Sequence, residues 1–150
     1  MRLGRIAAMV AAAVMVSVTV FAPAAHADTV QQWETRWNTG CLASGTARVV
    51  YVERDCNPMD ARQRWHMRYY ADGTVRFMNE YTTMCLDDSE YGVRGWGCND
   101  LAYQKWKVNG WGNGWYELLN QYTHHCLDVS EYGVRDIGCN GMTYQQWKVW

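Results

Sequence analysis

The sequence predicts an all-β protein made of three similar units of about 41 residues each. The first observation is self-similarity: residues 81–108 and 122–149, offset by 41 positions, are identical at 19 of 28 positions. The second is turn chemistry, because Asp-Gly and Asn-Gly pairs, which are typical of hairpin turns, occur at matching places in two units. The third is that no segment between the glycines carries the 3.6-residue apolar stripe of a long helix.

Composition limits the class of protein further. A chain of 150 residues has the size of one domain. With 14 Lys+Arg against 15 Asp+Glu, it carries no electrostatic footprint for nucleic acid or for an anionic membrane. A hydrophobic content of 49% with only two prolines argues against disorder. Nine Trp and ten Tyr favour side chains that pack on one side and hydrogen-bond on the other.

The first segment is predicted to be a secretory signal peptide. Arg2 and Arg5 give a positive start, an apolar stretch follows, and Ala25-His26-Ala27 is typical of a cleavage site. We expect residues 1–27 to be removed, which leaves a secreted domain of 123 residues, 28–150, with a net charge of −3. The sequence has no second transmembrane stretch, so no membrane insertion is expected after cleavage.

Because an exported protein meets an oxidising environment, we expect the six cysteines to form disulfides. Six cysteines allow 15 pairings, and the sequence alone does not choose among them. Their spacings of 15, 13 and 13 residues favour bonding within each unit, which pairs Cys41 with Cys56, Cys85 with Cys98 and Cys126 with Cys139. A zinc site is the alternative, but no Cys-x-x-Cys spacing is present, so no metal is expected.

The first unit is a degenerate copy of the other two. It keeps Cys41-Leu42, Cys56-Asn57 and the Gln-x-Trp of Gln63 to Trp65, and the three Gln-x-Trp motifs lie 41 residues apart. If Gln-x-Trp lies on a strand, both side chains face the same side. We then expect core tryptophans and buried glutamines bonded to loop backbone, with direct ligand contact as the alternative for the glutamines. These residues are Gln63, Trp65, Gln104, Trp106, Gln145 and Trp147.

Two hairpins are predicted at Asp72-Gly73 and Asn113-Gly114, nine residues after Gln63 and Gln104. The matching turn of the third unit would fall at position 154, beyond the sequence. The stretch around Val30–Trp33 is the free candidate for the missing strand. The two ends of the chain would then close a threefold ring.

Three copies of Cys-Leu-(Asp)…Cys-Asn…Gln-x-Trp resemble the ricin-type β-trefoil lectins over all of residues 28–150. The resemblance implies a β-trefoil of twelve strands, six in a barrel and six in three hairpins that cap it, and it implies carbohydrate binding. The short cysteine loop and Tyr-Gln-x-Trp are most similar to actinohivin-like lectins, which are small mannose-binding trefoils. Their site pattern falls on Asp87, Asn99, Tyr103, Asp128, Asn140 and Tyr144.

The sequence also departs from that pattern. Val93-Arg94 and Val134-Arg135 stand where actinohivin-like repeats carry Val-Tyr, so the sugar preference does not transfer. In the first unit Ala43 replaces the Asp and Arg62 replaces the Tyr. We therefore expect two sugar sites, not three.

The expected sites carry groups suited to sugar hydroxyls. Asp87 and Asp128 can accept from adjacent hydroxyls, while Asn99 and Asn140 can both donate and accept. Tyrosine rings suit the C–H face of a sugar, and the arginines add donors or pair with Glu90 and Glu131. Structural alternatives remain, because the aspartates and asparagines could form turns and the tyrosines could pack loops. The rings and arginines are Tyr91, Tyr103, Tyr132, Tyr144, Arg94 and Arg135.

The sequence thus predicts a secreted, monomeric lectin for glycans containing mannose, galactose or xylose, with no cofactor. A glycosidase needs two facing carboxylates, but Asp88 beside Asp87 becomes Val129 in the other copy. Glu90 and Glu131 remain possible second acids, although a site that is copied twice on one small domain suits binding better. No Ser-His-Asp triad, phosphate loop or metal motif is visible, so no enzyme is expected. The open alternatives are a protease inhibitor, since some β-trefoils act through an exposed loop, and a secreted protein that binds no sugar.

Overall fold

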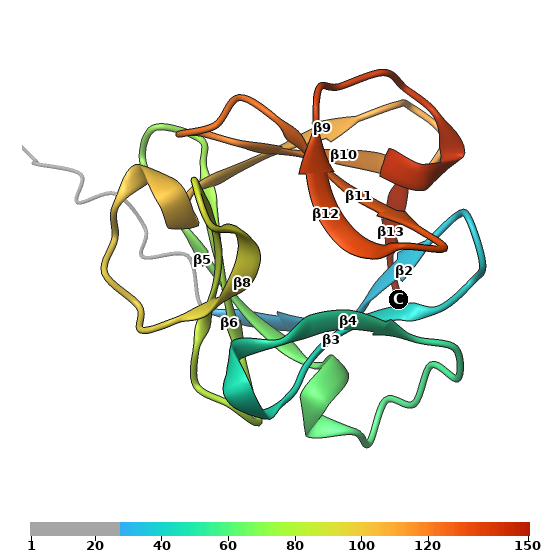
Figure 1. Cartoon of the computed structure of the whole chain (residues 1–150), viewed down its shortest axis with the longest axis horizontal. Coiled ribbons are helices and arrows are strands. Elements are labelled where there is room, and N and C mark those ends of the chain that lie inside the picture. Colours follow the sequence, from blue (N-terminus) through green and yellow to red (C-terminus); the bar gives the residue numbers. More distant parts are fainter. Residues whose placement is uncertain (1–27) are drawn as a thin grey trace, which may run out of the picture.

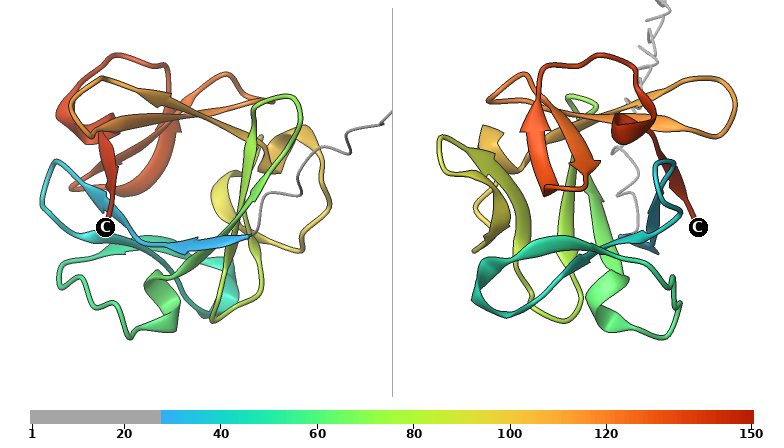
Figure 2. Two further views of the ribbon diagram at one scale, coloured as in Figure 1. Left: turned by 180° about the vertical axis from the view of Figure 1, so that it is seen from behind. Right: turned by 45° about the vertical axis from the view of Figure 1, so that its right-hand side comes forward.

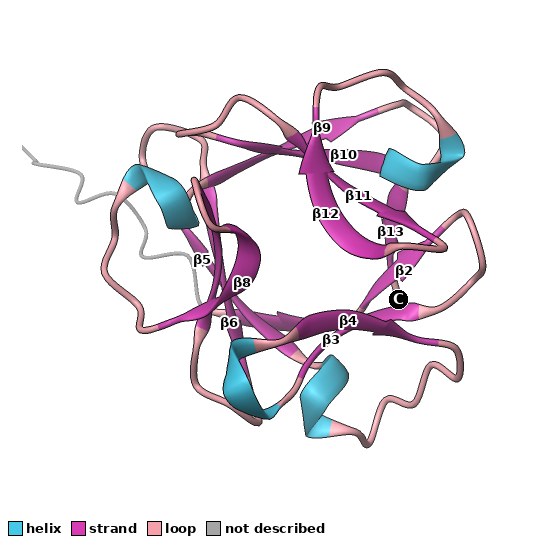
Figure 3. Cartoon of the chain, viewed as in Figure 1, coloured by secondary structure: helices cyan, strands magenta, loops and turns pink. Residues whose placement is uncertain are grey.

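A computed structural model describes residues 28–150, and the signal peptide expected at residues 1–27 lies outside them. The described chain is all-β, with short 3-10 turns as its only helical elements (Figures 1 and 3). Its strands are β1 (Thr29–Gln31), β2 (Trp33–Thr35), β3 (Cys41–Ser44), β4 (Val50–Glu53), β5 (Trp65–Tyr69), β6 (Val75–Asn79), β7 (Cys85–Ser89), β8 (Gly92–Trp96), β9 (Trp106–Gly110), β10 (Tyr116–Asn120), β11 (Cys126–Ser130), β12 (Gly133–Ile137) and β13 (Trp147–Val149). The 3-10 turns are η1 (Thr46–Arg48), η2 (Ala61–Gln63), η3 (Ala102–Gln104) and η4 (Thr143–Gln145).

A ring of antiparallel strands closes the barrel. β5, β6, β9, β10 and β13 pair in that order, and β13 then pairs with β2. The N-terminal segment completes the ring, because β1 pairs with β5 while β2 pairs with β13. The end of the chain lies beside these first strands in both views of Figure 2. The expected closure by the stretch around Val30–Trp33 is therefore confirmed.

Three further hairpins cap the barrel around a common axis: β3–β4, β7–β8 and β11–β12 (Figure 1). β4, β8 and β12 contact one another, so these hairpins form one end of the molecule. The arrangement is the predicted β-trefoil. In two hairpins the turn is short, with Gly92 and Gly133 at positive φ, whereas the first hairpin has a longer loop that contains η1.

Tryptophans build the core, one from each unit, at the start of β5, β9 and β13. Trp65, Trp106 and Trp147 have no exposed surface. Each indole N–H donates to a leucine carbonyl at the base of a capping hairpin, with N···O distances of 2.9–3.0 Å, and these leucines are Leu42, Leu86 and Leu127. Each tryptophan thus ties the barrel to a cap.

We expected the glutamine of each Gln-x-Trp to lie on the strand, and this was wrong. Each glutamine instead ends a 3-10 turn just before the strand. There it joins both sides of a cysteine loop. The Gln104 amide donates to the Gly97 carbonyl at 3.0 Å and accepts from the Asn99 N–H at 2.9 Å. Gln63 and Gln145 make the corresponding pairs of bonds, so the expected backbone partners are present.

Disulfides close the same loops. Cys41 is bonded to Cys56, Cys85 to Cys98 and Cys126 to Cys139, which are the pairings that the repeat spacing favours. Both predicted barrel hairpins are present, but five residues separate their last paired positions. These loops are longer than the two-residue turns that Asp-Gly and Asn-Gly indicate. In the part of the chain that the structure describes, no helix has the length and hydrophobicity needed to cross a membrane.

Candidate functional site

The capping hairpin of the second unit places an aspartate opposite an arginine. Asp87 on β7 and Arg94 on β8 are cross-strand partners, and Arg94 Nε donates to Asp87 Oδ1 at 3.1 Å. The other carboxylate oxygen accepts from the Gln104 amide at 3.2 Å. The Asp87 side chain is only 3% exposed, so these two bonds use both of its buried oxygens.

A hollow of about 250 Å³ opens beside this pair. Its walls include every residue expected for the second site: Asp87, Tyr91, Arg94, Asn99 and Tyr103. Four other lining residues were not expected in the site: Ser89, Glu90, Trp96 and Leu101. Of these four, Trp96 carried a signal in the sequence, because a large aromatic side chain close to the expected sugar-binding residues offers a packing surface.

The third unit repeats the pair but not the surroundings. Arg135 Nε donates to Asp128 Oδ1 at 2.8 Å, and this hydrogen bond raises the pKa of the Arg135 guanidinium. The other oxygen of Asp128 is buried without a hydrogen-bond partner in residues 28–150. Ile137 stands in the place of Trp96, and Tyr132 at the hairpin turn is 81% exposed.

The first unit lacks this arrangement altogether. Ala43 is buried at the Asp position, and its cross-strand partner is Tyr51 instead of an arginine. Arg62, at the position of Tyr103, is held by Asp60 through an ion pair of 2.6 Å. The first unit therefore offers neither the pair nor the ring.

The asparagines have a structural role in all three units. The side-chain oxygens of Asn57, Asn99 and Asn140 each accept from the backbone N–H two residues later, at 2.9–3.0 Å. The first unit makes the same bond although it lacks the pair, so this turn does not mark a sugar site. In the second unit Asn99 also lines the hollow, where its amide nitrogen makes no hydrogen bond to the described residues.

The tyrosines before Gln-x-Trp have different surroundings. The Tyr103 ring borders the hollow and packs against Tyr122, with the ring centres 4.1 Å apart. The Tyr144 ring packs against Trp37 at 5.9 Å. Tyr91 and Tyr132, at the hairpin turns, are the most exposed rings of the candidate sites, although the Arg94 guanidinium lies over one face of the Tyr91 ring.

The second acid of the second unit is buried away from the hollow. Asp88 has no exposed surface, and its carboxylate accepts from the Thr123 hydroxyl at 2.5 Å. Burial raises its pKa to about 6. Asp88 does not line the hollow, so it does not face Asp87 across a bound sugar as a glycosidase would require.

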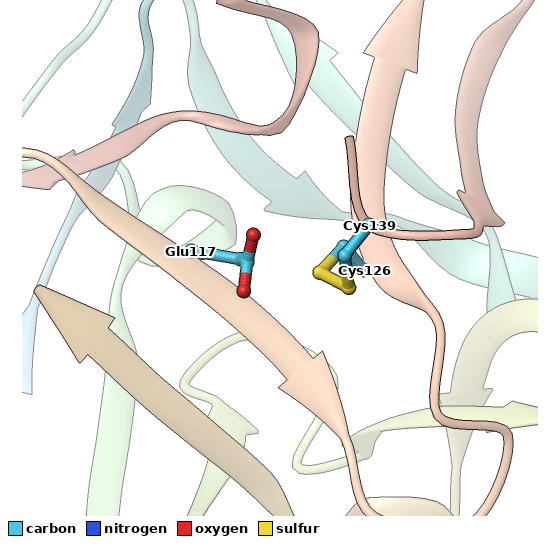
Figure 4. Close-up of side chains that lie close together, drawn as sticks. All are labelled: Glu117, Cys126 and Cys139. Carbon is cyan, nitrogen blue, oxygen red and sulfur yellow. A yellow bond between two sulfur atoms is a disulfide. The ribbon is translucent and has the colours of Figure 1, made fainter. Parts of the chain in front are cut away.

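One group of possible metal ligands lies elsewhere, on the third unit. The Glu117 carboxylate lies beside the sulfurs of Cys126 and Cys139 (Figure 4). These two sulfurs are bonded to each other, so the group lacks the thiolates that would bind a metal.

The repeat pattern matches one protein family over most of the chain. The model of the ricin-type β-trefoil lectin domain matches residues 38–147. The chain belongs to the ricin-type β-trefoil lectin family. No curated protein matches the sequence. The ricin-type lectin domain is a carbohydrate-binding and generally non-enzymatic fold, and with three disulfides it is consistent with an extracellular protein.

Solved structures show the same fold at low sequence identity. A designed threefold-symmetric protein, ThreeFoil, is 18% identical with a TM-score of 0.71, over 80% of this chain and 96% of that one. SeviL, solved with the asialo-GM1 saccharide, is 15% identical with a TM-score of 0.66, over 82% and 97% of the two chains. An endo-β-galactosidase from Clostridium perfringens is 15% identical with a TM-score of 0.69, over 80% of this chain but 31% of that enzyme.

Proposed function

We propose that this protein is a secreted lectin that binds glycans at two sites, one in the second unit and one in the third. The observation that carries the proposal is the repeated Asp–Arg pair beside an exposed tyrosine, Asp87–Arg94 with Tyr91 and Asp128–Arg135 with Tyr132. The first unit, which has Ala43 at the Asp position, serves a structural role.

Each site offers the chemistry that sugar recognition needs. The ring face of the exposed tyrosine suits the C–H side of a pyranose. The arginine and the asparagine amide supply hydrogen-bond donors for ring and hydroxyl oxygens. A second tyrosine, Tyr103 in one site and Tyr144 in the other, adds a further aromatic surface. Direct acceptance of a sugar hydroxyl by Asp87 would need displacement of Arg94 or Gln104, because both carboxylate oxygens are already bonded.

We further propose removal of residues 1–27, a monomeric domain of residues 28–150, and no cofactor. SeviL, with the same fold, was solved with a saccharide, and this supports a glycan as the ligand class. The candidate sugars are mannose, galactose and xylose, alone or within polysaccharides. Because arginines stand at both sites where actinohivin-like repeats carry tyrosine, the preference among these three sugars must be measured.

Retention on sugar resins tests the proposal. The protein is passed over mannan, xylan and galactose resins, and bound protein is eluted with the free sugar. We expect retention on at least one resin, and loss of that retention in a Tyr91→Ala/Tyr132→Ala double variant. Both rings are exposed, so the substitutions spare the core. Met59→Ala is the matched control, because Met59 is 80% exposed on the first unit. Failure to bind any of the resins would contradict the proposal.

A further inference from the structure

Arg94 is held on three sides in the hollow of the second unit. Its guanidinium carbon lies 4.8 Å from the ring centre of Tyr91 and 4.2 Å from that of Trp96. Its Nε is bonded to Asp87. Stacking on aromatic rings and a carboxylate bond fix the orientation of a guanidinium before any ligand arrives.

The outer edge of this guanidinium is free. The two terminal nitrogens of Arg94 make no hydrogen bond to residues 28–150, although the side chain lines the hollow. Asp87 is the opposite case, with its buried oxygens bonded to Arg94 and Gln104. The group in position to meet a ligand is thus the arginine, and the aspartate holds it in place.

A second cation reaches the same indole from the first unit. The Arg48 guanidinium carbon lies 3.8 Å from the Trp96 ring centre, and no carboxylate within residues 28–150 forms an ion pair with it. Arg48 and Ala47 both adopt positive φ in the long first hairpin loop. This conformation is unfavourable for residues with a side chain, and such residues cluster at functional sites. One opposing charge, the exposed Glu90, lines the hollow without an ion-pair partner in the described chain.

The third unit lacks the aromatic contacts that hold Arg94. Ile137 replaces Trp96, and Arg135 lies over no aromatic ring within residues 28–150. The Arg135 side chain is 41% exposed, against 24% for Arg94. The two sites therefore share the pair but differ in how firmly the arginine is held.

We infer that the second-unit site selects saccharides that carry a carboxylate or a sulfate, with Arg94 contacting the anion and Asp87 acting as a positioning residue. The two terminal nitrogens of a guanidinium present parallel N–H donors that match the paired oxygens of such a group. Arg48 adds electrostatic attraction. This inference rests on the proposed glycan binding and names the ligand class of one of its two sites.

Calorimetric titration with matched ligands tests the inference. Trigalacturonic acid is compared with its methyl ester, which has the same backbone without the charge, and galactose 6-sulfate with galactose. At low salt we expect at least one anion to bind about tenfold more tightly than its neutral counterpart, because charge-assisted bonds are the stronger ones. The larger of the two gains identifies the anion that is recognised. Raising the salt concentration should weaken binding of the anionic ligand and leave binding of the neutral ligand unchanged.

Variants assign the selectivity to residues. Arg94→Lys keeps the charge but loses the paired donors, and should lower the affinity for the anion about tenfold. Trp96→Ile copies the third unit and should bring the ratio of anion to neutral affinity closer to one. Arg48→Gln should weaken binding of the anion. Lys107→Gln, on β9 outside the hollow, removes one positive charge in the same way and should leave that binding unchanged, so it is the control.

Asp87→Asn separates positioning from direct contact. If Asp87 acts only by positioning Arg94, this variant should keep binding of the neutral ligand. Loss of neutral binding in the folded variant would make Asp87 a direct contact and overturn the assignment. Equal affinity for anion and neutral ligand in the unaltered protein would overturn the inference while the proposed function stands. Failure to bind any of the four ligands or the sugar resins would overturn both.

Discussion

At the scale of single residues, Asp88 is a buried acid whose ionisation should cost stability. One carboxylate oxygen accepts from Thr123, while the other is buried without a partner in the described residues. Burial raises its pKa from 3.8 to about 6. The folded protein therefore retains a proton that the unfolded chain loses between these values, so stability should fall as the pH rises through that window.

Asp88→Asn should remove this loss, because the amide keeps an acceptor for Thr123 without a charge to desolvate. We expect the variant to gain about 2–3 kcal/mol relative to the unaltered protein on going from pH 4 to pH 7.5. Urea unfolding at both pH values measures the gain. Asp55→Asn, at an exposed acid, is the control. The same pH dependence with and without Asp88 would contradict the assignment.

Asn120 is a second residue with a defined energetic role. Its amide donates to the Tyr103 carbonyl at 2.9 Å, and its oxygen accepts from the N–H groups of Tyr122 and Thr123. Asn120→Ala would remove three hydrogen bonds to partly buried backbone groups and should destabilise the fold by about 2–3 kcal/mol. The free energy of unfolding in urea measures this. Asn109→Ala, at an exposed asparagine, should change it by less than about 0.5 kcal/mol.

At the scale of elements, the first capping hairpin can be converted toward the other two. Ala43→Asp on β3 places a buried carboxylate opposite Tyr51 and should destabilise the protein by about 3–5 kcal/mol. Adding Tyr51→Arg on β4 recreates the cross-strand pair and should recover at least about 1 kcal/mol of this loss. A double-mutant cycle in urea measures the coupling. Additive effects of the two substitutions would show that the pair does not form.

The elements were predictable wherever the repeat carried the information. Three copies at one spacing were enough for the fold, the disulfide pairing and the core role of Trp65, Trp106 and Trp147, because each copy supports the other two. We expected Gln104 on a strand, because Gln-x-Trp fits a strand as well as a 3-10 turn. The 3-10 turn is favoured by the bonds of the Gln104 amide to both sides of the cysteine loop, and these form only in the folded protein. The hairpin loops are longer than expected for a similar reason, since Asp-Gly also fits longer turns.

The site was less predictable than the fold. The expected second-site residues line one hollow, but the bonding of Asp87 to Arg94 depends on cross-strand register, which seven residues of sequence separation do not reveal. Arg48 could not be assigned to this site, because it comes from another unit and meets Trp96 only in the folded protein. Outside the site, we also missed Asn79 and Asn120, which lie one repeat apart and bond backbone groups in the same way.

At the scale of the whole molecule, the two proposed sites on one domain predict avidity. A shallow site that makes a few hydrogen bonds, each worth ~0.5–1.5 kcal/mol, should bind a monosaccharide on the order of 1 mM. Two sites that engage one decorated surface can raise the apparent affinity by ~10²–10⁴.

Tyr91→Ala or Tyr132→Ala alone should therefore damage binding to an immobilised glycan far more than binding to the free sugar. Surface plasmon resonance on the glycan and calorimetry with the free sugar measure the two losses. Equal losses in both assays would show that the sites act independently.

The central claim is that the second and third units bind sugar and the first does not. Nuclear magnetic resonance on the ¹⁵N-labelled protein, titrated with the sugar that elutes it from resin, tests this directly. We predict saturable shifts of backbone amides around Tyr91 and Tyr132, no shifts of the amides around Met59 in the first unit, and loss of one set in each single tyrosine variant. Shifts around Met59 of the same size, or shifts at neither tyrosine, would contradict the account.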